Sequence, residues 1–384
     1  MRFPEFSGEW ERKALSEFVD RVTRRNKGLK STRPLTISAQ FGLVDQTEFF
    51  KKSVAGADLS NYYLLSKGEF AYNKSYSDGY PLGAIKRLDR YDSGVLSSLY
   101  ICFVPKPYMS SDYLVQYFES TKWNQVVKDI SGEGARNHGL LNVPVTGFFE
   151  TQHYIPKRDE QEKLGAFLTL IEKRIATQSK IIEELTTLRS ALIEKCAKQS
   201  GNFFSLSDIL KEVEERSTTA NQHQVLSSTV KGIFSQKEYF NKDIASEDNK
   251  GYKVVRKGHI VLSPQNLWMG NINYNDRFDI GIVSPSYKVF SIKEGFNPIF
   301  IAALLQTKKA LNEYMLASEQ GASIVRRNLN IEAFMAIKFR IPDARKQDSL
   351  SMAITAINAK LNNERWYLEQ LTMQKSCLLE KMFI

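Results

Sequence analysis

The sequence predicts a mixed α+β fold in which two mixed α/β domains are separated by two long antiparallel α-helices that form a coiled coil. The first observation is an internal repeat: Ile155 to Ala197 aligns without a gap with Ile341 to Phe383, with 13 identities over 43 positions. The offset of 186 residues is close to half of the 384-residue chain, whereas solenoid repeats have periods of roughly 20–50 residues. We therefore expect a duplicated domain-plus-helix with an internal pseudo-two-fold repeat.

The second observation is an apolar stripe in both copies of the repeat, found by stepping alternately four and three residues. The stripe consists of Leu164, Leu168, Ile171, Ile175, Ile182, Leu185, Leu192 and Cys196 in the first copy and of Leu350, Ile354, Ile357, Leu361, Leu368, Leu371, Leu378 and Met382 in the second. This spacing is typical of a coiled-coil seam. The seam is polar at matching steps, Gln178 with Glu364 and Arg189 with Lys375. The alternative is a pair of unrelated amphipathic helices that pack on their own domains.

The third observation is a fainter repeat in the globular segments. Alternating runs at 94–103 and 281–290 indicate strands, and the stretches 112–127 and 298–316 indicate helices. We expect mixed domains at 1–154 and 201–340, a central spacer helix at 155–200 and a C-terminal spacer helix at 341–384. Pro156 and Pro342 are expected near the helix starts, where a missing N–H has no cost.

Composition narrows the class of protein. A hydrophobic content of 42% with 25% charged residues is typical of a globular protein. No apolar run approaches the roughly 18–20 residues of a membrane span, so we expect neither a membrane span nor a signal peptide. The three cysteines form no CxxC pair and have no zinc-type spacing, so we expect a reducing cytoplasm and no metal.

The net charge of +10 points to nucleic acid as a partner. Residues 21–33 hold six basic side chains and no acidic one, and a basic surface is the electrostatic signature of nucleic-acid binding. We expect Arg24, Arg25 and Lys27 to contact phosphates. The alternative for this segment is a charged loop that only keeps the surface hydrated.

Several short motifs, in a fixed order, carry a family resemblance. They are Phe3-Pro4-Glu5-Phe6 with Gly8-Glu9-Trp10, the stretch from Lys67 to Arg87, Gly94 to Tyr100, Gly134-Ala135-Arg136, Ile-Pro-x-x-x-x-Gln from 155 and from 341, and the helix ends Leu192-Ile193-Glu194-Lys195 and Leu378-Leu379-Glu380-Lys381. With them the chain resembles the specificity subunits of type I restriction–modification systems over essentially its whole length. One departure is Lys346, where the family commonly carries an acidic residue before the glutamine. Another is that Gly134-Ala135-Arg136 has no exact copy in the second half.

The resemblance implies two target-recognition domains, each reading one half of a split DNA site, held apart by the paired helices. It also implies two methyltransferase subunits that bind the helices and supply S-adenosylmethionine chemistry at adenines. Two restriction subunits, which use ATP and Mg, would complete the complex. No cofactor is expected in this chain.

Catalysis by this chain is not expected. The sequence has no GxxxxGK[ST] phosphate loop, no Asn-Pro-Pro-aromatic motif and no glycine-rich fingerprint after a strand, which are the signatures of nucleotide-dependent chemistry. A nuclease built from scattered carboxylates is the enzymatic alternative, although no acid–base pair is visible. Two non-enzymatic alternatives are a stand-alone bipartite DNA-binding regulator and a coiled-coil scaffold.

Base readout requires side chains that donate and accept hydrogen bonds at groove edges. The candidate DNA-binding residues are Asn73, Lys74, Ser75, Tyr76, Lys86, Arg87 and Arg136 in the first domain and Gln265, Asn266, Trp268, Arg326, Arg327 and Asn328 in the second. The alternative assigns about half of them to the scaffold, with Tyr76 and Trp268 as core aromatics and Arg87 in a surface ion pair.

Overall fold

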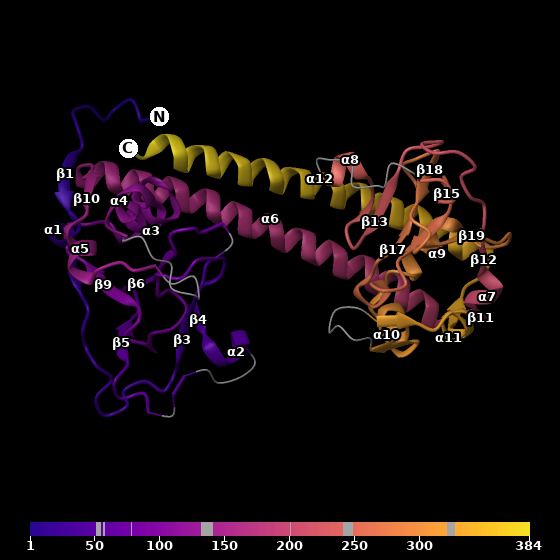
Figure 1. The fold of residues 1–384 in the computed structure, drawn as a ribbon, viewed down its shortest axis with the longest axis horizontal. Helices are drawn as coiled ribbons and strands as arrows, with labels where there is room; N and C mark the ends of the chain where they lie inside the picture. Colours follow the sequence, from indigo (N-terminus) through magenta and orange to yellow (C-terminus); the bar gives the residue numbers. More distant parts are fainter. Residues whose placement is uncertain are drawn as a thin grey trace. The chain divides into compact units, whose positions relative to one another are not determined.

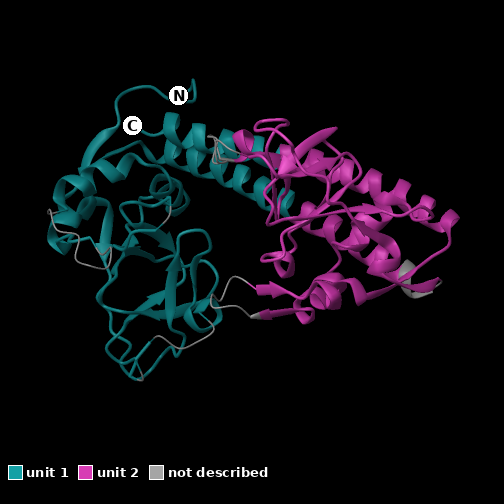
Figure 2. Cartoon of the chain, turned by 45° about the vertical axis from the view of Figure 1, so that its right-hand side comes forward, with its two compact units in different colours: residues 1–179, 367–384 teal, residues 180–366 magenta. Residues whose placement is uncertain are grey.

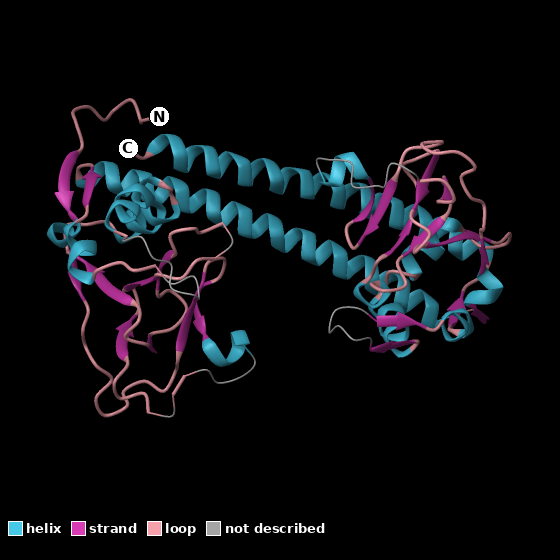
Figure 3. Cartoon of the chain, in the orientation of Figure 1, coloured by secondary structure: helices cyan, strands magenta, loops and turns pink. Residues whose placement is uncertain are grey.

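The computed structural model describes residues 1–50, 55–56, 58–77, 79–131, 141–199, 201–240, 249–320 and 327–384. It divides into two compact units, unit 1 with Met1–Ser179 and Tyr367–Ile384, and unit 2 with Lys180–Trp366 (Figure 2). Each unit contains part of both long helices, α6 (Arg158–Gln199) and α12 (Ala344–Met382) (Figure 1). Short strands and short helices make up most of the rest of each unit (Figure 3), so the predicted mixed fold with two long helices is confirmed.

Unit 1 is built from short antiparallel strands. They are β1 (Glu11–Ala14), β2 (Val19–Arg21), β3 (Leu35–Ser38), β4 (Gly42–Asp45), β5 (Tyr63–Ser66), β6 (Phe70–Asn73), β7 (Ala84–Arg87), β8 (Ser93–Leu96), β9 (Ile101–Pro105) and β10 (Gln152–Ile155). The short helices are α1 (Leu15–Phe18), α2 (Gln46–Phe50), α3 (Ser111–Glu119), α4 (Lys122–Ile130) and α5 (Val145–Glu150). A four-stranded sheet in the order β2-β9-β6-β7 is accompanied by the pairs β1–β10, β3–β4 and β5–β8.

Unit 2 repeats this plan. Its strands are β11 (Asn202–Ser205), β12 (Leu210–Glu212), β13 (Leu226–Thr229), β14 (Gly232–Ser235), β15 (Lys253–Arg256), β16 (Ile260–Leu262), β17 (Ile272–Tyr274), β18 (Ile280–Val283), β19 (Lys288–Ile292), β20 (Ser318–Gln320), β21 (Arg327–Leu329) and β22 (Lys338–Ile341). The short helices are α7 (Leu206–Ile209), α8 (Gln236–Phe240), α9 (Pro298–Leu304), α10 (Lys308–Leu316), α11 (Ile331–Ala336) and the 3-10 helix η1 (Leu267–Met269).

The two units share one topology. The sheet β12-β19-β16-β17 and the pairs β11–β22, β13–β14 and β15–β18 reproduce those of unit 1 in the same chain order. The hairpin β20–β21 is described only in unit 2, and the corresponding residues 132–140 lie outside the described residues. The internal repeat predicted from the sequence is therefore present in the fold of each unit.

In each unit a glycine at the matching position allows a leucine side chain to pack close to the backbone of a strand. Gly94 and Gly281 lie on β8 and β18, and a Cβ atom at either would come 2.4 Å from a leucine side chain, Leu35 or Leu226. Such a distance is far below van der Waals contact, so a side chain here would require the neighbouring hairpin to move. The repeated glycine therefore allows each hairpin, β3–β4 or β13–β14, to pack directly on its neighbouring strand.

Two predicted helices are each divided in the structure. The stretch 112–127 lies in α3 and α4, and the stretch 298–316 forms α9 and α10. Between the latter two, Thr307 Oγ1 accepts a hydrogen bond from the backbone N–H of Ala310 and caps a new helix. Such a side-chain cap competes with continuation of the helix. The spacing of apolar residues alone does not reveal where a cap interrupts the helix.

Two other boundaries differ from expectation. The predicted strands at 94–103 and 281–290 each contain a turn, so that each run holds parts of two strands, β8 and β9 or β18 and β19. The long helices begin at Arg158 and Ala344, after both prolines, because Ile155 and Ile341 are the last residues of β10 and β22. The residues expected to open the two helices, Ile155 and Ile341, therefore belong to paired strands instead.

The glutamine of the repeated Ile-Pro-x-x-x-x-Gln motif fastens each long helix to its own unit. Gln161 is 2% exposed; its Oε1 accepts from the backbone N–H of Ser110, the N-cap of α3, and its Nε2 donates to the Pro156 carbonyl. Gln347, 4% exposed, makes the same two contacts with Asn297 and Pro342. A buried amide satisfied at both ends fixes the angle of the helix, since leaving either group unpaired is costly.

The residue before that glutamine is acidic only in the first long helix. Glu160 is 2% exposed and accepts two hydrogen bonds from the Arg2 guanidinium, at 2.7 and 2.6 Å, and one from the Trp10 indole at 3.3 Å. It thereby anchors the N-terminal segment. At the matching position of the second helix stands Lys346, which is half-buried, so the carboxylate that accepts these hydrogen bonds in unit 1 is not repeated there.

The apolar stripe lies on the less exposed side of both long helices. Every stripe residue whose side chain is described is buried or half-buried. In unit 1, Glu172 of α6 pairs with Lys375 of α12 at 2.6 Å, and Arg174 of α6 donates a hydrogen bond to Tyr367 of α12. The later residue of α6 thus contacts the earlier residue of α12, so the two helix segments run antiparallel. In unit 2 the corresponding contact joins Arg189 to Asn358 at 2.9 Å.

Each unit has its own hydrophobic core, to which both long helices contribute. The unit 1 core contains Leu164 and Leu168 of α6 together with Leu378 and Met382 of α12. The unit 2 core contains Ile193, Leu350 and Ile354. No helix in the described part of the chain is both long enough and apolar enough to cross a membrane.

Candidate nucleic-acid interface

Two arginines of the basic segment 21–33, Arg24 and Arg25, are held by contacts within unit 1. Arg24 forms an ion pair of 2.7 Å with Glu69, which is 7% exposed. Arg25 donates a hydrogen bond to the Asn61 carbonyl and lies 4.5 Å from the centroid of the Tyr63 ring. Because these contacts tie both guanidinium groups to the scaffold, the two side chains stabilise the loop as well as adding positive charge.

The lysines of the same segment are presented outward. Asn26 is fully buried; its Oδ1 accepts from the backbone N–H of Ser31 at 3.1 Å and its Nδ2 donates to the Ser31 carbonyl at 2.8 Å. These bonds close the turn that carries Lys27 and Lys30, both exposed. Neither lysine forms an ion pair with the described residues. Among the basic side chains of the segment, Lys27 and Lys30 are thus well suited to contact phosphate.

A second group of candidates lies on the β6–β7 hairpin of unit 1. Asn73 Oδ1 accepts a hydrogen bond from the Ser75 backbone N–H at 3.1 Å. Tyr76 is 62% exposed and lies outside the core. The Lys74 side chain is half-buried, and burial lowers the pKa of its amino group. The amide of Asn73 therefore shapes the loop that presents Tyr76.

The two basic residues of β7 are paired with acids. Lys86 Nζ lies 2.5 Å from Glu119, and Arg87 lies 2.7 Å from Asp89 and 2.8 Å from Asp112. Opposite Phe70 in the strand register, Arg87 occupies the end of the hairpin away from Asn73. Lys86 and Arg87 therefore do not lie with Tyr76 on the exposed part of the loop. The remaining candidate of the first domain, Arg136, lies outside the described residues.

In unit 2 the structure brings the two predicted segments together. The Arg327 backbone N–H donates to the Gln265 carbonyl at 3.2 Å, which joins the loop 263–271 to β21. The Arg327 guanidinium donates to the Ser318 Oγ at 2.9 Å and to the Ser318 carbonyl at 2.6 Å, so it anchors the β20–β21 hairpin. Gln265 and Asn328 are exposed and Asn266 and Trp268 are half-buried. Arg326 lies outside the described residues.

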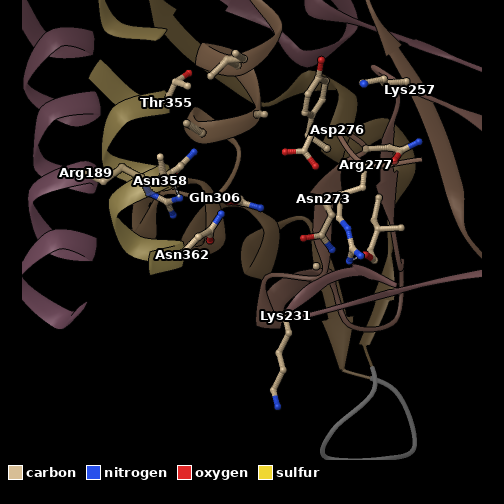
Figure 4. Close-up of a pocket in the computed structure, with 18 of the residues that line it drawn as sticks. Arg189, Lys231, Lys257, Asn273, Asp276, Arg277, Gln306, Thr355, Asn358 and Asn362 are labelled. Atoms are coloured by element: carbon tan, nitrogen blue, oxygen red, sulfur yellow. Dashed lines mark hydrogen bonds between the residues drawn. The ribbon is translucent and has the colours of Figure 1, made fainter. Parts of the chain in front are cut away.

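Unit 2 also contains a polar groove that the sequence did not single out. Two pockets of about 650 and 600 Å³ share Arg189, Lys231, Asn273 and Gln306 in their linings. Figure 4 shows Arg189 reaching from α6 toward Asn358, while Lys231 extends from the β13–β14 hairpin.

The cations of the two pockets differ in their pairing. In the first pocket Arg277 is paired with Glu238 at 3.1 Å, and Asp276 contributes an acidic group. In the second pocket the described lining residues include Arg189, Lys231 and Arg365 but no acidic residue. The groove therefore carries a local excess of positive charge. Within the described part of the chain, no group of acidic, histidine or cysteine side chains is placed to hold a metal ion.

Comparison with known proteins gives a match at the level of structure only. No family model matches the sequence, and no curated protein does. The fold matches the S subunit of a type I restriction–modification system from M. genitalium with a TM-score of 0.55 and 13% identity, over 100% of this chain and 99% of that chain. A structure concerned with complex assembly and conformational transition of the type I system matches with a TM-score of 0.52 and 12% identity, over 98% of this chain and 97% of that chain. The predicted resemblance is confirmed for the fold.

Proposed function

We propose that this chain is the DNA-specificity subunit of a type I restriction–modification complex and reads a bipartite, asymmetric DNA site. The observation that carries the proposal is the repetition of one topology in both units, in a chain whose fold matches an S subunit from end to end. A duplicated scaffold supplies two readers, and each unit binds one half-site. The chain itself performs no chemistry on DNA.

Differences between the two scaffolds support an asymmetric site. The connection from β6 to β7 spans residues 74–83, whereas the connection from β16 to β17 spans residues 263–271 and contains η1. Base-specific contacts require different side chains at groove edges for different sequences. In this proposal the exposed residues Tyr76 in unit 1 and Gln265 and Asn328 in unit 2 contact DNA.

The long helices supply the surface for partner subunits. Large apolar side chains lie exposed on them, Leu170 (63%) and Met373 (61%) in unit 1, and Leu188 (55%) and Trp366 (62%) in unit 2. Exposed apolar groups with an aromatic anchor are typical of protein interfaces. In this proposal these side chains contact two methyltransferase subunits, which bring S-adenosylmethionine. Two restriction subunits that use ATP and Mg complete the complex, which is cytoplasmic.

Adenine methylation mapped across a genome tests this function. The full chain and its methyltransferase partner are expressed in a host that lacks adenine methylation, with the methyltransferase alone as control. The expected result is methylation at one split, asymmetric motif that requires both proteins. Sequence-specific protection of DNA by the chain alone, without any methylation directed by the pair, would instead identify a stand-alone regulator.

Exchanging Lys27 and Lys30 for alanine should weaken binding to all duplex sequences alike. Both side chains are exposed, and removing one lysine–phosphate interaction lowers the slope of log K against log salt by roughly 0.9. The measurement is the salt dependence of duplex affinity for the complex with methyltransferase. Lys309→Ala with Lys338→Ala removes equal charge at exposed positions outside this turn and serves as the control. Equal slopes for both double variants would exclude the turn from the interface.

A further inference from the structure

The repeat places the same side-chain contact in both units, but with different chemistry. An offset of 186 residues aligns Arg189 with Lys375 and Asn358 with Glu172. In unit 1 the cation is neutralised, because Lys375 lies 2.6 Å from the Glu172 carboxylate. In unit 2 the Arg189 guanidinium donates to the Asn358 amide oxygen at 2.9 Å. An uncharged amide accepts the hydrogen bond but leaves the positive charge uncompensated.

Arg189 is placed where an uncompensated charge is costly. It is half-buried, and burial followed by repulsion from Arg365 lowers the pKa of its guanidinium. Removing a charge from water without a counter-charge is unfavourable, and the missing partner is an anion. The contact in unit 1 identifies what is lacking in unit 2, a negatively charged oxygen beside Arg189.

Two further cations line the same pocket. Lys231 at the tip of the β13–β14 hairpin and Arg365 of α12 join Arg189, and no acidic residue is present among the described lining residues of this pocket. Neither forms an ion pair with the described residues. Asp276 lines only the adjoining pocket, together with Lys257 and Arg277.

At the positions that match Arg365 and Lys231, the sequence of unit 1 carries no cation. The position matching Arg365 is Ser179, and the residue that precedes the glycine of the β3–β4 hairpin is Phe41 rather than lysine. Two of the three cations are therefore not repeated at the matching positions of unit 1 and do not follow from the shared scaffold.

We propose that the groove lined by Arg189, Lys231 and Arg365 binds a phosphate group. Arginine suits this ligand, because its planar guanidinium can donate two parallel hydrogen bonds to phosphate oxygens, while lysine adds a mobile point charge. This ligand is a backbone phosphate of duplex DNA bound to unit 2, an identification that rests on the proposed function. The groove positions the duplex and contributes affinity without reading bases.

Asn358→Glu tests the site while preserving the fold. The variant recreates in unit 2 the acid present in unit 1 and satisfies Arg189 internally. The first probe is inorganic phosphate, exchanged for chloride at constant ionic strength, with the thermal midpoint of the full chain as the readout. The wild type should gain thermal stability as phosphate increases, because a ligand of the folded state stabilises it, and the variant should gain much less. Equal phosphate dependence in both proteins would overturn the site.

The second probe is a duplex of random sequence. Asn358→Glu should lower affinity and reduce the salt slope by about one unit, because one phosphate is no longer bound. Asn363→Glu adds the same charge at an exposed residue of α12 that lines neither pocket, and should leave phosphate dependence and salt slope near wild type. If Asn358→Glu abolishes the phosphate effect but leaves the duplex slope unchanged, the groove binds free phosphate and the DNA assignment is overturned. Failure of the proposed function is distinguishable, since the wild type would then direct no methylation whatever the result with phosphate.

Discussion

Inserting one heptad into each long helix should lengthen the gap between the two half-sites by about three base pairs while both half-site sequences stay the same. Each helix continues from one unit into the other. Seven residues add roughly 10.5 Å of helix, against about 3.4 Å per base pair of DNA. The insertions belong between Ile182 and Glu183 and between Glu364 and Arg365, and a whole heptad preserves the phase of the apolar stripe.

The readout is the methylated motif of the complex with methyltransferase. A heptad inserted into α6 alone is the control. It shifts the apolar stripe of α6 relative to that of α12, so it should abolish methylation rather than lengthen the gap. New half-site sequences in the doubly extended chain would contradict the division of labour between readers and spacer. An unchanged gap would exclude the helices as the spacer.

Phe383→Ala should destabilise unit 1 by about 3–5 kcal/mol, the usual loss for a buried phenylalanine. Although it is the residue before the C-terminus, Phe383 is 2% exposed, and its ring centroid lies 5.6 Å from Tyr113 and 5.8 Å from Tyr117. It packs in the core formed by the first half of the chain. Truncation of this side chain leaves a cavity beside two tyrosines.

Chemical denaturation of the full chain measures this effect. Ile384→Ala is the matched control, because Ile384 is 59% exposed and surface substitutions usually change stability by less than about 0.5 kcal/mol. If the two variants unfold at the same denaturant concentration, the C-terminal segment is not part of the unit 1 core.

Local patterns in the sequence were sufficient for the architecture. The stripe spacing located both long helices, and the 186-residue offset predicted the duplicated topology, because a helix face and a repeated scaffold both repeat at regular intervals. The glutamines at 161 and 347 stood out as motif residues, and the structure shows that they clamp each helix to its unit. Helix boundaries were less predictable, since side-chain caps such as Thr307 and strand pairing at Ile155 compete with the helical pattern.

The sequence by itself determined the repeat, the helices and the excess of positive charge, because composition and periodicity are properties of the chain. Only the tertiary structure decided which charges remain available. Arg24 is paired with Glu69 and Arg87 with Asp112, whereas Lys27 is exposed on its turn. These pairings join residues far apart in the chain, so neighbouring sequence cannot reveal them. The hydrogen bond between Arg189 and an uncharged amide became visible only when folding placed Arg189 beside Asn358, 169 residues away.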